Sequence, residues 1–378
     1  MSHHLVIIGN GISGITCARH VRKQSDDLIS VISSETDYFY SRTALMYIYM
    51  GHMRYEDTKP YEDWFWEKNR IHLIKDHVTA VDVKNKKVSL EHGSTIKYDK
   101  LVIATGSKSN KPNFEGIELK GVQGLYGMQD LEAMFENTKG IKRAVIVGGG
   151  LIGIEMVEML LSQNIHVSFL VREPLFWNIV LPTEEAQVVT RHIKKHHVDL
   201  RLETELKEIK GDKAGKVTSV VTSTGDEIEC TFVGITVGVN PNISFLRDSG
   251  IETERGVLVN EYFETNIPDV YAIGDCAQQR NPVAGRRAIE QVWYTGRIHG
   301  ETLAQTLVGK KTAYNPGPWF NSAKFFDVEY QTYGIVANKP NEEENTFYWE
   351  HPDGEVCFRI VYNKTDETVV GFNSLGMR

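Results

Sequence analysis

Two copies of one glycine spacing are the residues of this chain best suited to chemistry. Both copies read Gly-x-Gly-x-x-Gly and differ in position: Gly9, Gly11 and Gly14 form the first, and Gly148, Gly150 and Gly153 the second. In this spacing the first glycine allows a tight turn out of a strand, the second lets the backbone approach a pyrophosphate, and the third allows close helix–strand packing. Two copies therefore predict two dinucleotides in one chain, with electrons passing between them.

The segments around both motifs fit this interpretation. Apolar runs precede the glycines at Leu5–Ile8 and Ala144–Val147, and helix-compatible segments follow at Ile15–Lys23 and Ile154–Leu161. A strand, a glycine turn and a helix would leave free N–H groups at the helix start, facing the anion. The context makes the pair a much stronger signal than either motif alone.

Composition limits the class of protein. A chain of 378 residues with 41% hydrophobic residues can bury a large core and is expected to divide into two or three domains. The net charge of −8 argues against nucleic-acid binding. Glu155 and Glu158 interrupt the most hydrophobic stretch, so we expect no membrane span. The first strand starts at Leu5, which leaves no room for a signal peptide, and we expect a cytoplasmic protein.

The four cysteines are far apart in the sequence. They form neither a Cys-x-x-Cys pair nor a metal-ligand spacing, and they lie at Cys17, Cys230, Cys276 and Cys357. This usage is typical of a reducing compartment. It predicts no local dithiol relay and no metal site.

Three further segments carry glycine turns. Tyr98–Ser107 is expected to be a strand ending in Ala-Thr-Gly, Asp269–Cys276 a strand ending in Gly-Asp, and Gly238–Asn242 reads Gly-Val-Asn-Pro-Asn. With the two fingerprints, these segments resemble the FAD-dependent pyridine nucleotide-disulfide oxidoreductase superfamily, in the family's order and over residues 1 to about 310. Within it, the chain is similar to the branch of ferredoxin, rubredoxin and nitrite reductase flavoproteins.

The resemblance implies an α/β fold with two Rossmann-like dinucleotide-binding domains, as in glutathione reductase, plus a small α+β domain. Residues 1–110 and 236–312 would form a discontinuous FAD domain, 111–235 an inserted NAD(P)H domain, and 313–378 a C-terminal interface domain. We expect a hairpin at Val78–Val83 and Lys87–Leu90. In the last piece we expect antiparallel strands and a final turn near Gly371; the strands are Asn321–Phe326, Tyr330–Val336, Phe347–Glu350 and Val356–Tyr362.

The resemblance also assigns cofactor contacts. Besides the glycine fingerprints, it implies cofactor-binding roles for Glu35, Arg42, Ala104, Thr105, Gly106, Gly238, Gly274 and Asp275. Glu35 would bind the adenosine ribose, although it lies farther from the fingerprint than the usual ~20 residues, so Ser34 is an alternative. Asp275 would lie beside the ribitol and pyrophosphate, or cap a following helix, or both.

Arg42 lies in a segment similar to Tyr-x-Arg-Pro-x-Leu of the reductase branch. Related oxidases and coenzyme A-disulfide reductases carry a redox cysteine at or beside this position, and this chain has none. Cysteine-based disulfide or peroxide chemistry needs a thiolate, so it is disfavoured. Met46-Tyr47 stands where the family usually has a flavin-side lysine, which makes Tyr47 a candidate catalytic residue.

Two other candidate catalytic residues come from family positions. Glu155 matches a glutamate near the flavin–nicotinamide junction, or it merely complements the dipole in the first turn of a helix. Trp293 resembles a tryptophan flanking the isoalloxazine, or it is a core aromatic.

The nucleotide's identity stays open. NAD-specific members usually place an acid where Val171 stands, whereas Arg172 matches the first of two arginines that bind a 2′-phosphate. The second arginine's place holds Asn178, and Arg172 could simply be a surface residue beside Glu173. We therefore expect NADH or NADPH as cosubstrate.

The function implied is electron transfer from NAD(P)H through FAD to an external acceptor. Because no partner dithiol is present, we expect a ferredoxin- or rubredoxin-type protein, with a quinone or other small acceptor as the alternative. A redox sensor or interaction protein with weak catalysis is a further alternative, favoured by the missing flavin-side lysine. A homodimer is possible in this family.

Overall fold

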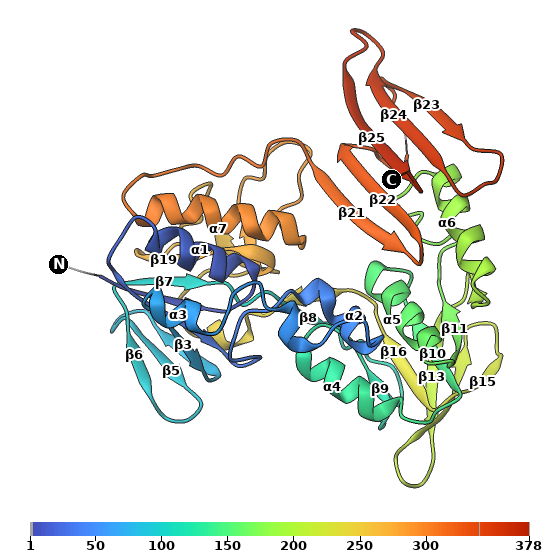
Figure 1. Cartoon of the computed structure of the whole chain (residues 1–378), viewed down its shortest axis with the longest axis horizontal. Coiled ribbons are helices and arrows are strands. Elements are labelled where there is room, and N and C mark those ends of the chain that lie inside the picture. The colour runs from blue at the N-terminus through green and yellow to red at the C-terminus, as the bar shows by residue number, and fades with distance from the viewer. Residues whose placement is uncertain (1–2, 340, 378) are drawn as a thin grey trace. The chain divides into compact units, whose positions relative to one another are not determined.

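The structure is a computed structural model that describes residues 3–339 and 341–377. The chain forms two compact units, each built from separated stretches (Figure 1). The first unit comprises residues 1–48, 53–108 and 240–317, and the second comprises 49–52, 109–239 and 318–378. Residues 318–378 thus group with the second unit, and their assignment as a separate interface domain stays a prediction.

A five-stranded parallel sheet forms the centre of the first unit. Its order is β19-β7-β1-β2-β3, with bounds β1 (His4–Ile8), β2 (Leu28–Ser33), β3 (Ile71–Lys75), β7 (Lys100–Ile103) and β19 (Val270–Ala272). β1 and β7 are buried almost throughout, as expected for parallel strands covered on both faces. Their carboxyl ends lie side by side where the strand order reverses, which is the usual ligand-binding position in open α/β sheets.

Helices α1 (Ile12–Arg22) and α7 (Trp293–Leu307) pack against each other in this unit (Figure 1). The expected hairpin is present and has a third strand, giving the antiparallel set β4 (Val78–Asp82), β5 (Lys87–Leu90) and β6 (Thr95–Lys97). The remaining helices and strands are α2 (Leu45–Tyr49), α3 (Trp64–Lys68), β8 (Ser107–Ser109), β17 (Val239–Pro241), β18 (Val257–Val259) and β20 (Ala277–Gln279). Of these, α2, β8 and β17 each cross the boundary between the two units.

The second unit repeats the parallel-sheet plan. Its order is β12-β11-β10-β16-β9, with bounds β9 (Val122–Gln123), β10 (Arg143–Val147), β11 (His166–Leu170), β12 (Asp199–Arg201) and β16 (Phe232–Ile235). In each sheet the strand that leads into a fingerprint is central. The helices are α4 (Met128–Asn137), α5 (Leu151–Ser162) and α6 (Thr183–Lys195), and the antiparallel strands are β13 (Leu206–Gly211), β14 (Val217–Thr222) and β15 (Glu227–Glu229).

The C-terminal segment forms a five-stranded antiparallel sheet in the order β21-β22-β25-β24-β23. The bounds are β21 (Phe320–Phe325), β22 (Val328–Gly334), β23 (Glu344–Glu350), β24 (Cys357–Asn363) and β25 (Val369–Leu375). The expectation of a final turn near Gly371 is wrong, because Gly371 lies inside β25, the middle strand. Gly371 pairs with Gly334, and a Cβ at Gly371 would come within 2.6 Å of the backbone of Ile335. The glycine marks a close approach of two backbones rather than a turn.

Within the described residues, no helix is both long and apolar enough to cross a membrane.

Candidate dinucleotide-binding sites

The first fingerprint packs in the way its spacing predicts. Gly9 has φ +115°, and a Cβ there would lie 2.1 Å from the carbonyl oxygen of Ala104 at the end of β7. A Cβ on Gly14 would lie 2.1 Å from the carbonyl oxygen of Gly9, so the helix can approach the turn only without a side chain. Gly11 differs from both, because nothing lies within 4 Å of its Cβ position. The first and third glycines serve the fold, and the second faces open space.

The start of α1 is prepared for an anion. Gly11 is the N-cap residue, no side chain caps the helix, and its first turn contains no acidic residue. The first N–H groups of a helix lack intrahelical partners, and together with the helix dipole they attract negative charge. A pyrophosphate beside Gly11 would satisfy them.

The Ala-Thr-Gly and Gly-Asp segments are brought to the same place. The Thr105 hydroxyl donates to the carbonyl of Asn242 (2.7 Å), and the Asn242 N–H donates to the carbonyl of Gly106 (2.9 Å). On the other side, a Cβ at Gly274 would lie 2.4 Å from Oγ of Ser13, inside the fingerprint. The segments that the sequence placed in one site therefore surround one helix start.

His299 supports this arrangement and was not identified from the sequence. The Gly274 N–H donates to Nδ1 of His299 (3.1 Å), which is a buried residue on α7. Burial lowers the pKa of His299 to about 3, with help from Arg286, so the ring is neutral and able to accept this hydrogen bond. No sequence motif marks His299, because its role depends on the tertiary packing of α7.

Asp275 lies in a single 3-10 turn, Gly274–Cys276, and accepts a hydrogen bond from the Ser107 hydroxyl (3.3 Å). Ser107 in turn accepts from the Gln291 amide (2.8 Å). Strand β20 follows the turn, so the alternative that Asp275 caps a following helix is wrong. Ser107 and Gln291 are further members of this site that the sequence did not indicate.

Glu35 follows β2, and its carboxylate is bound by two side chains of its own unit. Nη1 of Arg42 donates to Oε1 (2.9 Å), Nη2 donates to Oε2, and the Tyr40 hydroxyl also donates to Oε1. The two residues that the sequence assigned separately to ribose and cofactor binding thus form a bidentate ion pair. Because Glu35 lies just after β2, this ion pair holds both side chains near the end of that strand.

The other two first-unit candidates are half-buried. Tyr47 lies on α2, and its carbonyl accepts from the Met53 N–H (3.3 Å). Trp293 is the first residue of α7 and contacts Tyr294 edge to face. Their catalytic assignment stays a prediction.

In the second fingerprint, too, the first and third glycines are closely packed and the second has no close neighbour. Gly148 has φ +113°, and its Cβ would lie 2.6 Å from the carbonyl oxygen of Thr236; that of Gly153 would lie 2.3 Å from the carbonyl oxygen of Gly148. The Cβ position of Gly150 has no neighbour within 4 Å. Gly150 is the N-cap of α5, which again has no side-chain cap and no acid in its first turn.

Glu155 therefore does not lie in the first helical turn, and the alternative that it complements the helix dipole there is wrong. Burial raises the pKa of Glu155 to about 7, and the nearby Glu158 carboxylate adds to this effect. Glu158 pairs with Lys324 of β21 (3.6 Å). A carboxyl group whose pKa is raised to about 7, just beyond the first turn of the helix that follows the second fingerprint, is a candidate functional group.

The residues that could discriminate between nucleotides lie at the end of β11. Val171 is fully buried, and a Cβ on Gly149 would meet its side chain at 2.8 Å, so this position serves packing. Nε of Arg172 donates to Glu173 (2.8 Å), and the Arg172 side chain is 69% exposed. Gly238 has φ +92°, and its carbonyl accepts from the Asn110 N–H (3.1 Å). The binding roles of Arg172 and Gly238 stay predictions.

All four cysteines are buried free thiols. Burial raises the pKa of every one, to about 11 for Cys276 and about 12 for Cys230 and Cys357. The raised pKa values favour the neutral thiol at every cysteine, and none forms a disulfide. Buried, neutral thiols disfavour cysteine-based redox chemistry.

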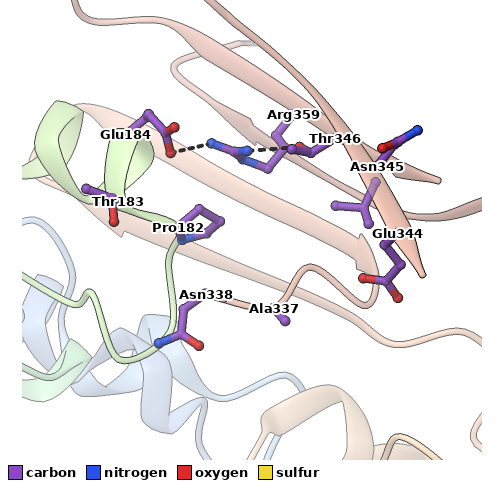
Figure 2. Close-up of a pocket in the computed structure, with 10 residues that line it drawn as sticks. Pro182, Thr183, Glu184, Ala337, Asn338, Glu344, Asn345, Thr346 and Arg359 are labelled. Carbon is purple, nitrogen blue, oxygen red and sulfur yellow. Dashed lines mark hydrogen bonds and ion pairs between the residues drawn. The ribbon is translucent and has the colours of Figure 1, made fainter. Parts of the chain in front are cut away.

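A pocket of about 210 Å³ lies elsewhere in the second unit, between the start of α6 and the C-terminal sheet (Figure 2). Among the described residues, Glu184, Glu344 and the cation Arg359 line it, and Arg359 already donates to Glu184 (2.7 Å) and Thr346 (2.9 Å). The excess of carboxylates disfavours a pyrophosphate, and the volume is below the usual range for cofactor sites. This pocket is distinct from both fingerprints.

Comparison with known proteins agrees with the two glycine cradles, which are the fingerprint turns with the helix starts at Gly11 and Gly150. The family model of the pyridine nucleotide-disulphide oxidoreductases matches residues 3–294. This chain belongs to that family. It is 31% identical to the nitrite reductase [NAD(P)H] of Bacillus subtilis over 96% of the chain, and spans about half (47%) of that protein's length. It is 28% identical to the NADH-rubredoxin oxidoreductase of Clostridium acetobutylicum, covering 100% of the chain and 93% of the relative.

Among solved structures, the ferredoxin reductase of Rhodopseudomonas palustris superposes with a TM-score of 0.90 over 99% of this chain and 91% of its own. At 22% identity this likeness concerns the fold alone. The predicted family and α/β fold class are confirmed, and the matching family is one of oxidoreductases named for pyridine nucleotides.

Proposed function

We propose that this protein is an FAD-dependent NAD(P)H oxidoreductase that passes electrons to a rubredoxin- or ferredoxin-type protein. The observation that carries the proposal is the pair of helix starts at Gly11 and Gly150. Neither has a side-chain cap, and no atom lies within 4 Å of the Cβ position of either glycine. One chain that can hold two dinucleotides is suited to transfer between them.

Each cofactor has residues suited to hold it. In the first unit, Gly11 and the N-terminus of α1 would bind the FAD pyrophosphate, with Asp275 nearby and Glu35 toward the ribose. In the second unit, Gly150 and the N-terminus of α5 would bind the nicotinamide nucleotide. FAD, when bound, supplies the redox chemistry, because a flavin accepts a hydride and can release its electrons singly. The protein binds and orients the cofactors, and it raises the pKa of Glu155.

The acceptor is proposed to be external, because all four thiols are buried and burial raises the pKa of each. A one-electron carrier protein fits the splitting of a hydride's two electrons. The Clostridium relative, named for rubredoxin and matched over nearly its whole length, favours the same class. We also infer a cytoplasmic location, where thiols stay reduced.

A second candidate is a flavoprotein sensor with weak catalysis. Tyr47 in place of the family's flavin-side lysine supports it. A quinone or another small-molecule acceptor would instead leave the reductase role intact and change only the partner.

Steady-state turnover with alternative acceptors tests the proposal. Purified, FAD-loaded protein would be supplied with NADH or NADPH under anaerobic conditions, and then with rubredoxin, ferredoxin or a soluble quinone in separate assays, with oxygen tested in air. We expect rapid flavin reduction, and we expect the highest kcat/KM with either rubredoxin or ferredoxin as acceptor. Slow reduction by both nucleotides would contradict the proposal and favour the sensor.

A further inference from the structure

Two histidines and an aspartate that belong to neither fingerprint meet in the second unit. His192 and His196 lie four residues apart on α6 and therefore on one face of the helix. Asp327 comes from the turn between β21 and β22. One ligand atom from each lies within 4.8 Å of the other two. The prediction of no metal site came from the cysteine spacing, and it did not consider this cluster, whose aspartate is remote from the histidines along the chain.

The three atoms converge as metal ligands do. Oδ1 of Asp327 is 2.7 Å from Nε2 of His192 and 3.1 Å from Nε2 of His196, and the two nitrogens are 3.2 Å apart. Zinc bonds to histidine and carboxylate ligands are about 2.0–2.2 Å long, which places neighbouring tetrahedral ligands roughly 3.3 Å apart. A single ion can therefore touch all three atoms with small side-chain adjustments.

Hydrogen bonding alone leaves this cluster poorly satisfied. Both imidazole Nε2 atoms approach the same carboxylate oxygen and each other, and Nδ1 of the buried His192 has no partner in the described part of the chain. The turn is also strained, because the bulky Phe326 has φ +56°. Its ring stacks on His196 with centroids 4.1 Å apart, which holds Asp327 toward the helix.

We propose that His192, His196 and Asp327 form a site for a divalent transition metal of the zinc and cobalt class. Two imidazoles and one carboxylate suit such ions better than Mg²⁺ or Ca²⁺, which prefer oxygen ligands. Three protein ligands leave one position for water. The ion joins α6 to the β21–β22 hairpin, and thereby ties the C-terminal sheet to the nucleotide-binding part of the second unit.

The surroundings set the expected strength. Ligating histidines usually donate their other ring nitrogen to a partner, and loss of such a partner weakens metal binding about 10–100-fold. Because Nδ1 of His192 has no such partner among the described residues, we expect binding about 10–100-fold weaker than at a comparable site whose histidines are both supported.

Metal binding to the FAD-loaded chain of residues 1–378 tests the site. Co²⁺ would be titrated after chelator treatment, and its visible d–d absorption followed, because histidine and carboxylate coordination in a four- or five-coordinate site gives intense bands. Zn²⁺ competition and a Zn²⁺-dependent rise in melting temperature provide independent readouts. The variants are Asp327→Asn and His196→Ala, which alter side chains at least one-third exposed, and His197→Ala is the matched control because it removes the adjacent, exposed histidine.

We expect wild type and His197→Ala to bind Co²⁺ with the same spectrum and affinity, and Zn²⁺ to displace it. Asp327→Asn and His196→Ala should weaken binding at least tenfold and lose the Zn²⁺-dependent melting shift, while keeping their FAD. If wild type shows no such spectrum, or if folded Asp327→Asn and His196→Ala both bind as wild type does, the proposed site is wrong.

Discussion

Gly14 is pressed against Gly9: a Cβ on Gly14 would lie 2.1 Å from the carbonyl oxygen of Gly9. Gly11, between them in sequence, has no neighbour within 4 Å of its Cβ position. The same contrast holds for Gly153 and Gly150 in the second fingerprint. Glycines of one motif therefore serve two separable purposes, one in folding and one in ligand binding.

The first prediction separates these purposes at the FAD cradle. Gly11 has φ −72°, which alanine adopts readily, so Gly11→Ala should fold normally yet place a methyl group where the pyrophosphate approaches. We expect at least a tenfold rise in the FAD dissociation constant, or about 1.4 kcal/mol. Gly14→Ala should instead lower unfolding stability by about 1–3 kcal/mol through overpacking. Chemical denaturation and fluorescence titration of apoprotein with FAD measure both, and normal FAD affinity in Gly11→Ala would count against this cradle.

The second prediction concerns the pH dependence of stability. The pKa of Glu155 rises from its usual value near 4.5 to about 7. As pH increases through this window the unfolded chain loses its proton first, so the folded state becomes less favoured. Stability from this group is highest below pH 4.5, falls up to pH 7 and is constant above, with a total loss of roughly 3 kcal/mol.

Glu155→Gln should remove that loss, which urea denaturation between pH 4.5 and 8 can measure. Glu158→Gln is the companion variant, because removing its charge should lower the Glu155 pKa and shift the fall in stability to lower pH. An unchanged pH profile in Glu155→Gln would mean that this carboxyl titrates normally.

Much of the fold followed from the sequence because its signals are local. Apolar runs such as Leu5–Ile8 next to a glycine turn fix a buried strand and a helix start together. The prediction of a turn at Gly371 is wrong because glycine occurs both in turns and where two strands approach closely, and only the pairing with Gly334 distinguishes these cases. His299 and the Asp327 cluster could not be found, because packing between distant segments creates them. The Glu35–Arg42 pair joins residues that the family resemblance had assigned individually.

The third prediction is that the thiols are inert in the folded protein. All four are buried, and burial raises the pKa of each, so iodoacetamide at pH 8 should label native protein very slowly and label four thiols after denaturation. Single Cys→Ala substitutions should leave the rate of flavin reduction within about twofold, although buried positions lose some stability. Mass spectrometry and stopped-flow absorbance check these outcomes. Loss of hydride transfer in a folded, FAD-loaded single variant would show that a cysteine takes part.

The fourth prediction concerns the attachment of the C-terminal sheet to α6. Nε of Arg359 donates to the fully buried Glu185 (2.8 Å). Arg359→Met leaves that carboxylate without its cation and should cost about 3–5 kcal/mol in unfolding free energy. The double variant with Glu185→Leu should regain much of this loss. Arg191 of the same helix forms a more exposed pair with Glu350 of β23. Arg191→Met should therefore lower the unfolding free energy by less than about 1 kcal/mol. Equal effects of the two arginine substitutions would show that burial of Glu185 is unimportant.

The central claim, that two separate cradles hold donor and flavin, is tested most directly by anaerobic stopped-flow reduction of the bound flavin in wild type and Gly150→Ala. Gly150 has φ −100° and an open Cβ position, so the variant should fold and keep its full FAD content. We predict that wild type is reduced rapidly by NADH or NADPH, and that Gly150→Ala needs at least tenfold more nucleotide for the same rate. Wild-type flavin that neither nucleotide reduces, or an identical concentration dependence in the variant, would contradict the account.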